Sequence, residues 1–147
     1  MAEEGSALIE IDARPEDILA VITDVDAYPE WMSPFRKAVV LERDEAGRPK
    51  RAEFAVDAKL QVIDYTLEYE YSPAGVAWDS VAGDMKQIKG GYDLAGHDAG
   101  TTVTYHYTID PGFPIPGFIM KKAVKLLVST ALEDLKTRVE TIERSRR

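Results

Sequence analysis

The sequence contains no cysteine and only two histidines, His97 and His106. The absence of cysteine excludes disulfide bonds, thiolate metal ligands and cysteine nucleophiles. His97 falls in a glycine-rich turn, and His106 falls among threonines on the polar face of a predicted strand. Neither histidine is therefore placed to hold a metal ion with other ligands or to act beside a nucleophilic serine. We expect no metal ion, no cofactor and no catalytic set built on these residue types.

Basic residues are fewer than acidic ones. The sequence has 18 Lys and Arg and 26 Asp and Glu, which gives a formal net charge of −8. A chain with this charge is repelled by phosphate backbones and anionic lipids, which argues against nucleic acid or bulk membrane as its main partner. No apolar run approaches the ~20 residues of a membrane span. The acidic residues 1–5 lack the apolar segment of a signal peptide. These absences predict a cytoplasmic protein without stable membrane insertion.

The composition that remains is that of an ordinary globular protein, with 45% hydrophobic and 30% charged residues. There is no internal repeat, no low-complexity segment and no long linker in the 147 residues. We therefore predict a single domain over residues 1–147. Its oligomeric state, monomer or dimer, stays open at this stage.

The first third of the chain predicts one strand and two short helices. Leu8, Ile9 and Ile11 indicate a strand over residues 7–12. A helix then starts at Pro15, because proline suits the first helical position and acidic residues follow in the first turn. A second short helix is expected before Trp31.

The middle of the chain changes to a period of two residues. The clearest strand covers residues 63–71, where Ile, Tyr and Leu alternate with Asp, Thr and Glu. Such alternation is typical of an antiparallel sheet with one buried and one solvated face. Six strands are predicted here, at residues 37–42, 52–57, 63–71, 76–81, 86–94 and 101–109. Gly90 and Gly91 lie inside one of them, where glycine indicates a bulge or a close approach of a helix.

The last predicted element is a long helix from Phe118 to about Glu143. Residues 110–117 are too rich in proline and glycine to be regular, and no glycine or proline follows until the end of the helix. Apolar residues then recur every three or four positions. At 1.5 Å per residue this helix is roughly 39 Å long, enough to cross a small sheet. Grouped strands followed by a helix indicate an α+β fold.

Several local strings resemble the START-like (SRPBCC) superfamily, in its polyketide cyclase/dehydrase and coenzyme Q-binding branch. They are Ile18–Trp31, Gly91–Leu94, Gly100–Tyr105 and the Pro-Gly-Phe-Pro run at residues 111–114. The resemblance implies a helix-grip fold, in which a curved antiparallel sheet of about seven strands wraps around the C-terminal helix. It also implies a cavity between sheet and helix, which members of the superfamily use for lipids, sterols, hormones, quinones or polyketides. Only some members are enzymes.

Aromatic residues dominate the strand face that should point toward the helix. They either fill the core or line a ligand cavity, and each buried phenol or indole then needs a hydrogen-bond partner. Trp31 and Phe118 belong to two apolar segments that could form the mouth, with Leu127 and Ala131 as the floor and the small Ala123 and Ala131 leaving space. The candidate ligand-binding residues are Trp31, Tyr65, Tyr69, Trp78, Tyr92, Tyr105, Tyr107, Phe118, Leu127 and Ala131.

Acidic residues suited to acid–base catalysis are predicted to point outward. Asp64, Glu68, Glu70 and Asp93 lie on the polar faces of their strands, although a shift of one residue would reverse this. The hypothesis of an enzyme therefore loses support. Three lysines at positions 121, 122 and 125 are either a solvated helix face, a site for an anionic head group or a contact with a membrane surface.

The leading functional hypothesis is binding or transport of a small hydrophobic ligand, such as a lipid, a quinone or a polyketide-like molecule. One alternative, which the resemblance permits, is a polyketide aromatase/cyclase or dehydratase. A further alternative is a toxin-like module that associates with ribosomes, in which the surface would matter more than the cavity. The charge of −8 argues against contact with rRNA but not against contact with a basic protein.

Overall fold

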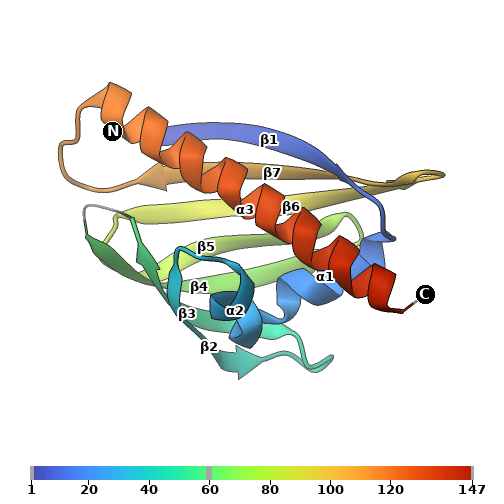
Figure 1. The fold of residues 1–147 in the computed structure, drawn as a ribbon. Coiled ribbons are helices and arrows are strands. Elements are labelled where there is room, and N and C mark those ends of the chain that lie inside the picture. The colour runs from blue at the N-terminus through green and yellow to red at the C-terminus, as the bar shows by residue number, and fades with distance from the viewer. Residues whose placement is uncertain (1, 59–60, 147) are drawn as a thin grey trace.

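A curved sheet of seven antiparallel strands is crossed on its inner face by one long helix in a computed structural model that describes residues 2–58 and 61–146 (Figure 1). Neighbouring strands follow the order β1-β7-β6-β5-β4-β3-β2. The elements are β1 (Glu3–Ile11), α1 (Pro15–Thr23), the 3₁₀ helix η1 (Val25–Ala27), α2 (Tyr28–Trp31), β2 (Phe35–Arg43), β3 (Pro49–Asp57), β4 (Val62–Ser72), β5 (Gly75–Gly83), β6 (Gln87–His97), β7 (Gly100–Asp110) and α3 (Gly117–Ser145). The predicted α+β helix-grip fold is confirmed.

Helix α1 begins at Pro15, with Glu16 and Asp17 in its first turn. Both features favour a helix start, because proline lacks the N–H that would be unpaired there and carboxylates interact well with the N-terminal end of the helix dipole. The helix buries Ile18, which is fully enclosed, in the core. The short second helix is divided into η1 and α2.

Strand β4 has the predicted register. Ile63 and Leu67 are buried on the inner face, whereas Asp64, Glu68 and Glu70 are exposed on the outer face. The pattern of hydrophobic side chains therefore predicts correctly which face of β4 points toward α3.

Strand β1 starts earlier than the hydrophobic pattern indicated. It begins at Glu3 because it pairs with β7 along its whole length, from Glu3 opposite Ile109 to Ile11 opposite Thr101. Backbone hydrogen bonding to a neighbour extends a strand beyond its apolar residues. Helix α3 likewise extends one residue before and two residues beyond the predicted 118–143.

The predicted reason for Gly90 and Gly91 in β6 was wrong. Pairing to β5 and to β7 continues through both residues without a register shift, so there is no bulge. A Cβ on Gly90 would lie 2.5 Å from the carbonyl oxygen of His106 and 3.3 Å from Nε1 of Trp78. The glycine instead makes room for the indole ring of Trp78.

The hydrophobic core consists of two clusters. One lies between α1, α3 and the β1 side of the sheet and includes Ile11, Val103 and Leu135. The other lies under α2 against β2, β3 and β4 and includes Phe54. In the described part of the chain, no helix is both long and apolar enough to cross a membrane.

Candidate functional site

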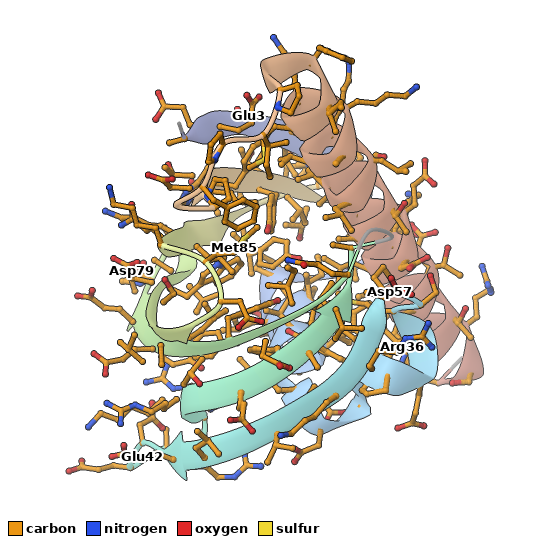
Figure 2. The ribbon with its side chains drawn as sticks, turned by 90° about the vertical axis from the view of Figure 1, so that its left-hand side faces the viewer. Glu3, Arg36, Glu42, Asp57, Asp79 and Met85 are labelled. Carbon is orange, nitrogen blue, oxygen red and sulfur yellow. The ribbon has the colours of Figure 1, made fainter. Side chains whose placement is uncertain are left out.

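A cavity of about 180 Å³ lies between the inner face of the sheet and α3. Residues from both core clusters line it, so it occupies the region where the two clusters would otherwise meet. Pro34, Ala58 and Met85 border it from segments at strand ends, on the side seen in Figure 2, where Met85 is labelled. The other lining residues are Tyr28, Met32, Phe35, Phe54, Val56, Ile63, Tyr65, Leu67, Tyr69, Trp78, Ile88, Tyr92, Tyr105, Ile109, Val124, Leu127, Val128, Ala131 and Asp134.

Aromatic rings in mutual contact form the sheet wall of this cavity. Trp78 lies with its ring centroid 5.5 Å from Tyr92 and 6.1 Å from Tyr69, both edge to face. Tyr92 and Tyr105 are 5.0 Å apart in the same arrangement. Edge-to-face contacts of this kind hold rings in fixed orientations. The wall is therefore apolar but carries hydroxyl groups at defined places.

Four of these hydroxyl groups, those of Tyr65, Tyr69, Tyr92 and Tyr105, form no hydrogen bond with any described residue. By contrast, the hydroxyl of Tyr28 donates to the carbonyl oxygen of Ile22. Among the described side chains, the only sealed polar atom without a partner is Nε of Arg51 on β3. The four phenol oxygens are therefore accessible from the cavity and can form hydrogen bonds with a ligand in it.

Burial keeps these phenols in their neutral form. It raises the pKa values of Tyr65, Tyr69 and Tyr92 well above 10.0 and that of Tyr105 to about 12. Removing a phenolate from water costs free energy, and the neighbouring tyrosines oppose ionisation further. At physiological pH the four groups therefore serve as hydrogen-bond donors and acceptors, and they are poor general bases.

One carboxyl group lines the cavity, that of Asp134, and it was not among the predicted site residues. It lies on α3, whereas the acidic residues considered as candidates for acid–base catalysis all lie on strands. Burial is the main cause that raises its pKa, and the charge of Glu133 adds to it, while the backbone N–H of Ser33 lowers it. The signal was present, because Leu127, Ala131 and Asp134 are spaced four and three residues apart and so share one face of the helix.

The strand acids have the orientation that was predicted. Asp64, Glu68, Glu70 and Asp93 are all exposed on the outer side of the sheet. His106 also lies there, with Nε2 3.8 Å from Asp93, and His97 contacts Glu10 at 2.8 Å. Within residues 2–58 and 61–146, no group of His, Asp and Glu is arranged to hold a metal ion.

Seven of the ten candidate residues come together around the cavity. They are Tyr65, Tyr69, Trp78, Tyr92, Tyr105, Leu127 and Ala131. Their role in binding a ligand stays a prediction. The lining residues that were not predicted come from several elements. They include Tyr28, Phe35 and Phe54 from α2, β2 and β3, Val124 and Val128 from α3, and Met85 from the turn before β6.

The other three candidates lie elsewhere. Trp31 borders a separate hollow between α1 and the end of α3, which also contains Asp17 and Arg138. Tyr107 packs beside Gly5 on β1, and Phe118 is 77% exposed at the start of α3. Ala123, expected to leave space inside, is exposed on the outer side of α3.

The lysines at the start of α3 do not face the cavity. Lys121, Lys122 and Lys125 are all exposed, and none of them lines the cavity. They share this end of the helix with the exposed side chains of Phe118 and Leu126. This placement does not support capture of an anionic head group inside the cavity, and contact with a membrane surface stays a prediction.

The family model for polyketide cyclase / dehydrase and lipid transport matches residues 11–136. The chain belongs to this family, and its resemblance to the START-like superfamily is confirmed. A comparison with curated proteins gives no significant match.

Solved structures with the same fold include proteins of different kinds. A START superfamily protein from Mycobacterium smegmatis has a TM-score of 0.85 and 22% identity, over 95% of this chain and 98% of that one. The Zhui aromatase/cyclase from Streptomyces sp. R1128 has a TM-score of 0.79 and 15% identity, over 95% and 94%. A STAR-related lipid transfer protein from Xanthomonas axonopodis has a TM-score of 0.75 and 18% identity, over 93% and 85%.

Proposed function

We propose that this chain binds a small, mostly apolar ligand in the cavity between the sheet and α3, and carries or sequesters it. The observation that carries the proposal is the set of four phenol groups without partners in an otherwise apolar cavity. A sealed core would pair these hydroxyls, because a buried polar group without a partner costs free energy. Hydroxyl groups left open on an apolar wall are what a ligand with a few oxygen atoms requires.

The size of the cavity limits the part of the ligand that it encloses. Its volume of about 180 Å³ is below the ~300–1,000 Å³ of typical ligand pockets. A cavity of about 150 Å³ is enough to hold benzene. We therefore expect one or two fused rings inside, with any further part of the ligand extending out of the cavity. A larger ligand can be fully enclosed only if α3 or the turns that border the cavity move.

The comparisons agree with a ligand of this kind. The family description includes lipid transport, and structures of the same fold include a lipid transfer protein and an aromatase/cyclase. A lipid, a quinone and a polyketide-like molecule each combine apolar surface with carbonyl or hydroxyl oxygens. Neutral tyrosines suit such oxygens better than they suit a charged head group.

A second candidate function is that of a polyketide aromatase/cyclase or dehydratase, and Asp134 favours it. A carboxyl group with a raised pKa, beside phenols that can polarise a carbonyl group, is the kind of acid–base group that such reactions need. The outward orientation of the strand acids leaves Asp134 as the single carboxyl group among the described lining residues.

Native mass spectrometry of the protein purified from its own host without detergent tests the leading proposal. We expect an excess mass that disappears on denaturation and that organic extraction identifies. Titration with acetylnaphthalene, a neutral two-ring ketone, tests the cavity directly if the purified protein is empty. An empty protein that also fails to bind this ketone would overturn the proposal.

Substitution of Tyr105 by Phe separates the carrier from the enzyme. A carrier loses one hydrogen bond, which corresponds to an affinity decrease of about tenfold. An enzyme that uses this phenol in the transition state loses orders of magnitude in kcat/KM.

A further inference from the structure

Asp134 is the only residue with a formal charge at neutral pH among the described residues that line the cavity. All other described lining residues are apolar, or are tyrosines that burial keeps neutral. The electrostatic character of the ligand site is therefore set by one carboxylate on α3. This observation extends the proposed function and rests on it.

Two basic residues, one on α3 and one on β2, are paired with other carboxylates. Lys136 lies 2.8 Å from Glu140, and Arg36, labelled in Figure 2, lies 2.7 Å from Asp57. Arg138 borders the separate hollow between α1 and the end of α3. No described cation forms an ion pair with Asp134, whose neighbours are the N–H of Ser33 and the like charge of Glu133. Its negative charge thus acts on the contents of the cavity.

A ligand carboxylate would meet two unfavourable conditions in this cavity. It would lose its hydration against apolar walls, and it would lie in the field of a like charge. Hydrogen bonds from the tyrosines would offset part of the first cost, but neutral donors do not supply the counter-charge that a buried anion requires. A ketone avoids both costs, and an ammonium group is attracted by Asp134.

We propose that the cavity selects neutral or cationic ring compounds and rejects carboxylates, and that Asp134 is the residue that determines this specificity. Fatty acids and other organic anions are then poor ligands. Ketones, quinones and amines with one or two rings are suitable ones.

Three probes with the same two rings test the proposal, namely acetylnaphthalene, naphthoate and naphthylmethylamine. Titration calorimetry on the whole chain at neutral pH should show naphthoate binding at least tenfold more weakly than the ketone, and the amine binding at least as tightly as the ketone. In the Asp134→Asn variant the difference between naphthoate and the amine should shrink at least tenfold. Asparagine keeps an oxygen that can accept the hydrogen bond from Ser33, so the variant should fold, and its thermal unfolding checks this.

Glu133→Gln is the matched control, because it removes the neighbouring carboxylate, which is exposed and does not line the cavity. It should leave the ranking of the three probes unchanged. Equal affinities for naphthoate and the ketone, or an Asn variant that ranks the probes as the native chain does, would overturn the specificity but leave the proposed function standing. Failure of all three probes to bind would overturn both.

Discussion

The rings of Trp78 on β5 and Tyr105 on β7 lie with their centroids 5.8 Å apart, although β6 separates the two strands. They meet because Gly90, the residue of β6 that pairs with Trp78, has no side chain. The indole lies over the glycine and contacts Tyr105, which pairs with Tyr92, two residues further along β6. One missing side chain therefore shapes the aromatic wall of the cavity.

Substitution of Gly90 by Ala should destabilise the protein. The new Cβ would lie 2.5 Å from the carbonyl oxygen of His106 and 3.3 Å from Nε1 of Trp78. Overpacking of this kind costs about 1–3 kcal/mol of unfolding free energy, which urea denaturation measures. Gly117→Ala is the control, because a Cβ there meets no atom within 4 Å. A Gly90→Ala variant as stable as the native chain would show that the backbone at His106 and the indole of Trp78 both adjust without cost.

Substitution of Ala131 by Phe should fill the cavity and abolish binding of the ketone probe. Ala131 lines the cavity from α3, so a phenyl ring there occupies the space that a ligand ring needs. Ala123→Phe on the exposed side of the same helix should leave the affinity unchanged. Calorimetric titration of both variants makes the comparison. Equal binding by the two variants would place the ligand outside the cavity.

Alkaline pH should reduce stability through the buried tyrosines. Burial raises the pKa of Tyr105 from its usual 10.0 to about 12. Above pH 10 the unfolded chain therefore releases a proton that the folded protein keeps, and the free energy of unfolding decreases as pH rises toward 12. Denaturation midpoints measured over this range should decrease less steeply in Tyr105→Phe.

Tyr107→Phe is the control for this titration. Tyr107 lies on the same strand, and burial raises its pKa less strongly than that of Tyr105. Its removal should change the slope of stability against pH less than removal of Tyr105. Identical slopes for the two variants would contradict the assignment of the effect to burial.

The start of α3 should bind anionic vesicles. Phe118 and Leu126 are 77% and 58% exposed beside Lys121, Lys122 and Lys125. Each lysine near an anionic surface contributes about 1 kcal/mol, so reversal of all three to Glu should weaken binding roughly a hundredfold or more. Sedimentation with phosphatidylserine vesicles at low salt measures the loss.

A charge-matched control reverses three other exposed basic residues, Lys50, Lys89 and Arg144. It has the same net charge as the first variant but keeps the basic end of α3. Equal loss of vesicle binding in both variants would show that total charge decides the interaction. Binding to neutral vesicles alone would assign it to the apolar side chains.

The sequence was sufficient to predict the order of elements and, in the strands with regular alternation, the buried face. In β4, alternation of apolar and charged residues specifies the buried side, because a shift of one residue would bury Glu68 and expose Leu67. Local patterns of this kind predict the buried face correctly because one face of the sheet is covered and the other is solvated.

The site was predicted less completely, because it depends on elements that are distant in sequence. Phe118 is exposed because the first turns of α3 lie at the edge of the sheet beside β1 (Figure 1). Asp134 lies in the cavity because α3 places the face that it shares with Ala131 over the aromatic wall. Neither the position of a helix along a sheet nor the space left under it is encoded in a short stretch of residues.

The pairing of β1 with β7 has a consequence for how the chain folds. Glu3 lies opposite Ile109, so the sheet cannot be completed until nearly all of the strands exist. Contacts between such distant residues cost loop-closure entropy before they stabilise anything, which slows folding. During synthesis, β1 is made before β7, the strand with which it pairs, and the strands are all made before α3, which covers their apolar face. Until α3 has been made, the apolar inner face of the sheet is open to contacts with other chains, which favours aggregation.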